Sequence, residues 1–212
     1  MSIRTLFHEA FMVWAADRGI GRHPQDPQSE HLVFTAGTGV SRYWPYPKEA
    51  ARVPHFVAAL LTAVRPNDRY WVYPARGAWS LGREAEAWPQ SRVWSSAVHA
   101  LGVLAGLRGA VGFNSTDWNA LCAMLFLQIT LGPSVRIDTL VVPELANAIL
   151  YFEHHAVVWV TLRDEAQLDA VVTAMDSAGY PLPTEPPDES FKSVPWMARG
   201  GLRVPSDTQC HD

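Results

Sequence analysis

The residues best suited to chemistry are the consecutive Glu153-His154-His155, which lie between two apolar runs. A carboxylate and two imidazoles can bind a metal, transfer protons or contact a partner. Side chains of neighbouring residues point to opposite sides of an extended backbone, so the two histidines are poor ligands for one metal unless a turn reorients them. We expect the acidic Asp138 and Glu144 to lie near this cluster. The pattern leaves three interpretations open, namely a catalytic or metal site, a partner or ligand contact, and a structural turn.

The motifs of well-known catalytic and metal sites are missing from the sequence. It contains no HExxH, CxxC or Gly-x-Ser-x-Gly. Cys122 lies in an apolar helical pattern and Cys210 in a polar tail, so we expect neither a disulfide nor a reactive thiolate. Gly37-Thr38-Gly39 lacks the further residues of a phosphate-binding loop and is expected to be a simple turn. We therefore expect no metal and no cofactor, and we favour a non-enzymatic function.

Aromatic and arginine side chains form a second group of interest. The chain has nine tryptophans in 212 residues. On a strand over 69–74, alternation places Arg69, Trp71 and Tyr73 on one face. Such clusters suit a protein interface or a planar ligand, and they also fill cores. Further aromatic residues are expected in loops: Trp44, Trp79 and Trp88, with Tyr43 and Tyr46 close by.

Hydrophobic periodicity predicts alternating helices and strands that position these groups. We expect helices over 4–18, 54–64, 93–101, 117–131 and 164–178, and strands over 31–36, 69–74, 110–113, 135–142, 148–152 and 157–162. These elements favour an α/β or α+β fold with a mixed sheet of about six strands and helices on both faces.

The strands 148–152 and 157–162 are expected to form a hairpin around the Glu-His-His cluster. We group Leu150 and Phe152 with Val157 and Trp159 on one face, so Trp159 is predicted to be a core residue. Both faces of the hairpin are apolar, which places it in the middle of a covered sheet. The helix over 164–178 begins with an Asp-capped turn that resembles a capping box. Its inward residues are expected to be Leu168, Val171, Val172 and Met175.

Length and composition indicate a single folded domain. Hydrophobic residues make up 48% and charged residues 18% of the chain, which excludes a disordered protein. We expect one domain over residues 1–199 and a mobile tail over 200–212. The longest apolar run, 121–131, is interrupted by Gln128 and is too short to span a bilayer. The start of the chain lacks a signal-peptide pattern, so a cytoplasmic protein without membrane contact is expected.

Charge is distributed unevenly along the chain. Residues 1–106 hold 11 basic and 8 acidic residues, a balance of +3, whereas residues 107–212 hold 6 and 13, a balance of −7. A net charge of −4 does not suit a general nucleic-acid binder, which must neutralise phosphates. The acidic half suits a basic protein partner, and the plain alternative is a solvated acidic surface.

Three functions follow from these observations. The first is a non-enzymatic bacterial binding protein, of the kind of an immunity-type antagonist that neutralises a toxin or effector by protein–protein contact. The second is an enzyme or ligand-binding domain with a site near Asp138, Glu153, His154 and His155. The third is a scaffold protein that self-associates, for example as a homodimer. In the first case the ionisation of the two histidines would make affinity depend on pH near neutrality.

Overall fold

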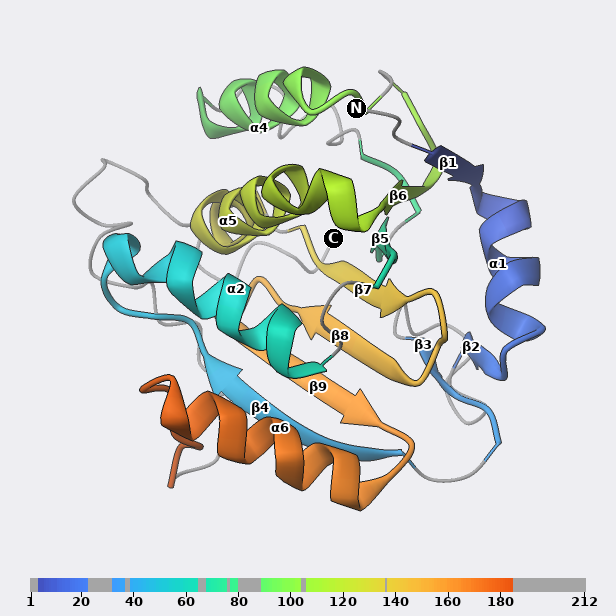
Figure 1. The fold of residues 1–212 in the computed structure, drawn as a ribbon. Coiled ribbons are helices and arrows are strands. Elements are labelled where there is room, and N and C mark those ends of the chain that lie inside the picture. The colour runs from blue at the N-terminus through green and yellow to red at the C-terminus, as the bar shows by residue number, and fades with distance from the viewer. Residues whose placement is uncertain are drawn as a thin grey trace, which may run out of the picture.

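A seven-stranded sheet and a separate pair of strands form the β-structure of the protein (Figure 1). The computed structural model describes residues 4–22, 32–36, 39–64, 68–75, 77–79, 89–103, 106–135 and 137–184. The strands are β1 (Arg4–Phe7), β2 (Ile20–Arg22), β3 (Leu32–Phe34), β4 (Val40–Pro45), β5 (Tyr70–Pro74), β6 (Gly109–Phe113), β7 (Thr139–Pro143), β8 (Ala148–Phe152) and β9 (Val157–Leu162). The helices are α1 (His8–Ala16), α2 (Val53–Val64), α4 (Pro89–Ala100), α5 (Trp118–Val135) and α6 (Glu165–Ser177), with short 3-10 helices η1 (Ala50–Arg52) and η2 (Ser115–Asp117).

The large sheet has the order β1-β6-β5-β7-β8-β9-β4, and β2 pairs with β3. The predicted α/β architecture with one central sheet is confirmed. Every pair of neighbouring strands runs antiparallel, however, whereas a mixed sheet was expected. The expectation rested on helices that separate strands in the sequence, which is typical of parallel crossovers. Here β4 and β5, which α2 connects, and β6 and β7, which α5 connects, do run in the same direction. Other strands lie between the members of each pair, so no two neighbouring strands of the sheet are parallel.

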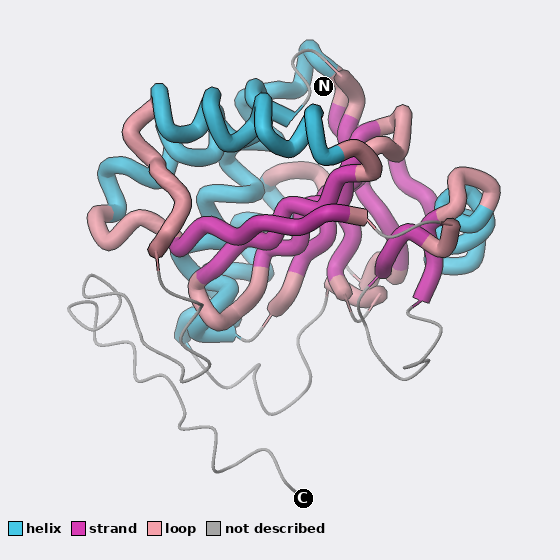
Figure 2. The backbone as a smooth tube through the Cα atoms, turned by 90° about the horizontal axis from the view of Figure 1, so that it is seen from below, coloured by secondary structure: helices cyan, strands magenta, loops and turns pink. Residues whose placement is uncertain are grey.

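The helices cover the two faces of the sheet unequally. Figure 2 shows the strands as one continuous layer with most helices gathered on one side of it. The larger core cluster, which includes Phe56, Trp94, Leu125 and Leu168, lies between the sheet and α2, α4, α5 and α6. A smaller cluster on the opposite face includes Phe11 of α1 and residues of β2 and β3. Helices therefore lie on both faces, as expected.

Several elements match the sequence prediction closely. The hairpin strands β8 and β9 have the predicted bounds. The helix predicted over 54–64 is α2, and its apolar residues Phe56, Val57, Leu60, Leu61 and Val64 are buried. Helix α6 begins after Asp164, whose side chain accepts a hydrogen bond from the Ala166 backbone N–H at 2.9 Å. In these elements local propensity and the tertiary fold favour the same structure.

Strands β1, β2 and β4 were not predicted. Residues 4–7 form a strand rather than the first turn of a helix. Strand β4 lies where a loop was expected, and Trp44 is only 1% exposed, with its Nε1–H donating to the Tyr180 carbonyl at 3.1 Å. The alternating apolar pattern of a strand is absent from β4, because Arg42 occupies a position on its inward face, opposite the buried Val160. Trp79 is buried as well, and Trp88 lies outside the described residues.

The face assignment of the β8–β9 hairpin was wrong by one residue. Tyr151 pairs with Trp159 and Phe152 with Val158. The turn from Glu153 to Ala156 is closed by a hydrogen bond from the Glu153 N–H to the Val157 carbonyl at 2.9 Å, and Ala156 has a φ of 63°. A shift of one residue moves every side chain to the other face. Trp159 therefore lies on the less covered face and is only partly buried.

Helix α5 continues past Gly132 to Val135, one turn longer than predicted. Within the ranges that the structure describes, no helix has both the length and the apolar character needed to cross a membrane. The tail predicted over 200–212 lies outside those ranges.

Candidate functional site

Strand β7 separates two polar groups that the sequence suggested would lie together. Asp138 immediately precedes β7 and Glu144 immediately follows it. Thr139 pairs with Phe152, so Asp138 lies beside the turn that follows β8. Glu144 lies at the other end of the strand, about 20 Å away at the usual rise per residue. The expectation that Glu144 joins the Glu-His-His cluster is therefore wrong.

Asp138 holds the turn between β8 and β9. Its Oδ1 accepts a hydrogen bond from the backbone N–H of His154 at 2.6 Å and contacts the ring Nδ1 of His154 at 2.8 Å. Its carbonyl accepts from the Ala75 N–H at 2.9 Å. The two side chains are 15% and 23% exposed, so the pair is reachable from solvent. An ionised Asp138 can only accept, so in this contact Nδ1 of His154 carries the proton, and the other ring nitrogen, Nε2, does not contact Asp138.

Glu153 is the second carboxylate at this turn. Burial, and then the charge of Asp138, raise the pKa of Glu153. A hydrogen bond from the Trp159 side chain and the charge of His154 act in the opposite direction. The Tyr46 hydroxyl donates to the Glu153 carbonyl at 2.9 Å, and burial followed by the charges of Asp138 and Glu153 raises the Tyr46 pKa well above its ordinary value. Two carboxylates therefore lie close enough to repel each other in a partly desolvated place.

His155 completes the cluster from the turn. Its ring centroid lies 4.1 Å from that of His154, with an angle of 49° between the planes. Asp138, Glu153, His154 and His155, which the sequence analysis singled out, are thus brought together with Trp159, which it assigned to the core. We refer to these five residues as the hairpin site.

An aromatic row leads across the sheet to the hairpin site. Register pairs join Tyr73 to Leu140, Leu140 to Tyr151, Tyr151 to Trp159 and Trp159 to Tyr43, all on one face. Burial decreases along the row, because Tyr73 is 3% and Tyr151 7% exposed, whereas Trp159 and Tyr43 are only partly buried. The rings of Tyr43 and Trp159 lie 5.2 Å apart, tilted by 45°. This face therefore becomes more accessible toward β9 and β4.

The second predicted group, Arg69 with Trp71 and Tyr73, belongs largely to the core. Trp71 is 5% exposed, and Tyr73 stacks on Phe11 with centroids 4.5 Å apart. The Tyr73 hydroxyl also contacts the His8 Nδ1 at 2.8 Å. The prediction that Trp71 and Tyr73 share one face is confirmed, but that face is covered by α1.

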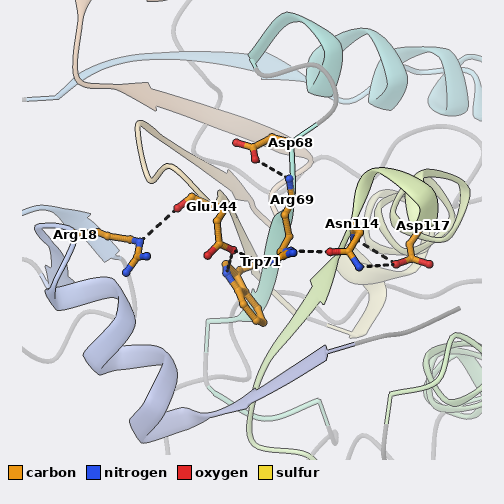
Figure 3. A network of polar contacts seen from close by, with 7 residues as sticks. All are labelled: Arg18, Asp68, Arg69, Trp71, Asn114, Asp117 and Glu144. Atoms are coloured by element: carbon orange, nitrogen blue, oxygen red, sulfur yellow. Dashed lines mark hydrogen bonds and ion pairs between the residues drawn. The ribbon is translucent and has the colours of Figure 1, made fainter.

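Arg69 and Glu144 form a network at the end of β7 opposite the hairpin site (Figure 3). Glu144 Oε2 accepts from the Trp71 indole N–H at 2.8 Å and lies 3.7 Å from the Arg69 guanidinium. Arg69 Nε donates to Asn114 Oδ1 at 2.6 Å, and the Asp117 carboxylate accepts from the Asn114 backbone N–H at 3.3 Å. The contacts join the ends of β5, β6 and β7 to the start of α5. They indicate a structural role for these residues.

The described residues give no geometric support for metal or thiol chemistry. In those parts of the chain no three His, Cys, Asp or Glu side chains are grouped as metal ligands. Cys122 is partly buried in α5, and burial raises the pKa of its thiol. Gly37 and Thr38 of the predicted turn, and Cys210, lie outside the described residues.

Comparisons of the chain with protein-family models, with curated proteins and with solved structures find no match.

Proposed function

We propose that this protein is a non-enzymatic binding protein that binds a basic protein partner at the hairpin site. The observation that carries the proposal is the meeting of the Asp138 and Glu153 carboxylates with the His154 imidazole at a partly exposed end of the sheet. A basic partner relieves the repulsion between the two carboxylates, and opposite charge accelerates encounter. Neutralisation of a toxin or effector by such contact, as an immunity-type antagonist does, is the specific role that we propose.

The fixed positions of these side chains support a binding role better than a merely solvated surface. Asp138 is held by two hydrogen-bond contacts to His154, and Glu153 lies partly buried on the same face of the hairpin as Trp159. Groups that are already ordered lose little conformational entropy when a partner binds. An exposed acidic side chain, such as that of Asp169 on α6, is not ordered in this way before a partner binds.

The test begins with a basic partner captured from the native host and identified. Association rates for the purified partner are then measured by stopped flow at low and high salt for wild type, Glu153→Lys and Asp169→Lys. Asp169 is the matched control, because it is exposed and lies on a helix that packs on the other face of the sheet. We expect Glu153→Lys to reduce the association rate at low salt by about tenfold or more, and Asp169→Lys to have little effect on it. High salt is expected to reduce the difference in association rate between wild type and Glu153→Lys, because it screens the charges.

A partner that associates with the Glu153→Lys protein as fast as with wild type, at both salt concentrations, would remove the hairpin site from the interface. The search would then move to the surface around Arg69. If no basic partner can be captured under native conditions, the proposed function itself is contradicted.

A catalytic role is the second candidate, because of the contact between Asp138 Oδ1 and His154 Nδ1. A carboxylate on Nδ1 orients an imidazole so that Nε2 serves as a general base. Hydrolysis of activated esters that is abolished in His154→Gln but retained in His155→Gln would favour this reading. Equal background rates in both variants and wild type would favour the binding protein.

A further inference from the structure

We propose that the basic partner inserts an arginine at the hairpin site, with its guanidinium on the Trp159 ring and its N–H groups directed at the Glu153 carboxylate. This inference rests on the proposed function and names the group that the partner supplies.

The first support is the placement of a ring beside a carboxylate. Tyr151 pairs with Trp159, and Glu153 follows Tyr151 by two residues, so strand alternation places the Glu153 side chain on the face that carries the Trp159 ring. A hydrogen bond from the Trp159 side chain also lowers the pKa of Glu153. Tyr43 lies 5.2 Å from Trp159 at a tilt of 45°, so the two rings form an angled aromatic surface. An ionised carboxylate offers about four acceptor positions, so the bond from Trp159 leaves acceptor capacity for a ligand. A ring face and a carboxylate together are what a guanidinium needs for stacking and for paired hydrogen bonds.

The second support is that this fold uses the same recognition within the chain. Among the described residues, guanidinium carbons lie over aromatic rings in three places: Arg163 over Phe34 at 4.1 Å, Arg18 over Trp14 at 4.6 Å and Arg52 over Tyr180 at 4.8 Å. Each of these arginines also donates to a backbone carbonyl close by: Arg163 to Ala146, Arg18 to Trp14 and Arg52 to Gly179. An arginine beside a ring and an adjacent acceptor is therefore a recurrent arrangement in this fold. The hairpin site offers a charged acceptor in place of a neutral carbonyl, which strengthens the hydrogen bond.

The third support is the charge around Glu153. The groups that act on its carboxylate are Asp138 from the residue before β7, His154 from the turn and Trp159 from β9. The Tyr46 hydroxyl donates to the Glu153 carbonyl, and the charge of Glu153 in turn raises the pKa of Tyr46. The charge of Asp138 and burial both oppose ionisation of Glu153. A guanidinium placed between the ring and the carboxylates supplies the missing positive charge. Arginine fits better than lysine because its planar, weakly hydrated head stacks on a ring while it donates.

The experiment compares two fluorescent peptides of equal length and charge, hexa-arginine and hexa-lysine, by anisotropy titration at neutral pH. We expect wild type to bind hexa-arginine about tenfold more tightly, the size of a partly desolvated cation–π contact. Trp159→Leu is expected to abolish the preference, and Trp159→Phe, which retains a ring, to keep part of it. Glu153→Gln is expected to weaken both peptides. Trp118→Leu is the matched control, a partly buried tryptophan on the helical side of the sheet, and retains the wild-type preference.

Equal affinity of wild type for the two peptides, or an unchanged preference in Trp159→Leu, would overturn the arginine assignment. If Trp159→Leu does not fold, as judged by circular dichroism, Trp159→Phe and Glu153→Gln decide the question. Failure of this inference is distinguishable from failure of the proposed function. A captured basic partner that is sensitive to Glu153→Lys but not to Trp159→Phe or Trp159→Leu leaves the function standing and moves the anchor away from Trp159.

Discussion

One oxygen of Asp138 contacts both the backbone N–H and the ring Nδ1 of His154, at 2.6 and 2.8 Å, although the residues are 16 positions apart in the sequence. This double contact connects the start of β7 to the turn between β8 and β9, and so fixes the geometry of the hairpin site.

Removal of the Asp138 carboxylate should therefore destabilise the protein. We expect Asp138→Ala to lower the free energy of unfolding by about 2 kcal/mol, because a partly buried N–H then loses a charged acceptor. Asp138→Asn keeps one oxygen acceptor and is expected to cost about half as much. Urea denaturation monitored by tryptophan fluorescence measures both. A loss well under 1 kcal/mol in Asp138→Ala would show that the double contact contributes little.

Glu153→Gln should stabilise the protein at neutral pH. The pKa of Glu153 is raised in the folded state above its ordinary value of 4.5, so the folded state binds the proton more tightly than the unfolded state. Wild type consequently loses stability, relative to Glu153→Gln, as the pH rises from 4.5 through the raised folded pKa, and the difference vanishes below 4.5. Denaturation midpoints from pH 4 to 7 for both proteins check this. Asp169→Asn on exposed Asp169 is the control, and a Glu153→Gln protein less stable than wild type at pH 7 would contradict the argument.

Truncation of α6 should distinguish its buried and outer faces. Leu168 is 1% and Val171 2% exposed, whereas Val172 is only partly buried. We expect Leu168→Ala to cost about 2–5 kcal/mol, as for other buried leucines. Val171→Ala should destabilise more than Val172→Ala, although the sequence placed both residues inward. Guanidinium chloride denaturation gives the three values, and a Leu168→Ala loss well under 1 kcal/mol would exclude this face from the core.

Gln128 makes a buried polar link that an apolar residue cannot replace. Its amide donates to the Ile137 carbonyl, and its Oε1 accepts from the Thr139 hydroxyl at 2.7 Å, with Gln128 itself 0% exposed. We expect Gln128→Leu to cost about 2–4 kcal/mol, because two buried groups lose their partners. In a double-mutant cycle, Thr139→Val should recover part of that loss. A purely additive double mutant would show that the two side chains are not coupled.

The sequence predicted elements whose local and tertiary signals agree. Asp164 marks the start of α6, and the alternating apolar residues of β8 and β9 mark both strands with their observed bounds. Strand β4 could not be found in this way, because Arg42 interrupts its inward face and its partner β9 lies far along the chain. The pairing of β4 with a strand so distant in the sequence produces no local sequence pattern from which it could be predicted.

The candidate site was predictable where its residues are close together in the sequence or belong to strands that were predicted. The residues Glu153, His154 and His155 are adjacent in sequence, and Asp138 lies just before a strand that pairs with theirs. The roles of Glu144 and Trp159 depended on strand register. A one-residue shift at the turn reversed the face of Trp159, and the direction of β7 carried Glu144 to the far end of the sheet.

The position of β4 at the border of the sheet has a consequence for biosynthesis. Val40 pairs with Leu162, so β4 leaves the ribosome long before β9 is made and has no neighbour in the large sheet until then. Contacts between such distant segments form late and slow folding. A nascent strand with exposed Tyr43 and Trp44 invites aggregation, and Arg42 and Pro45 within it are residues of the types that suppress intermolecular strand pairing. The residue that conceals β4 from sequence analysis thus also protects the growing chain.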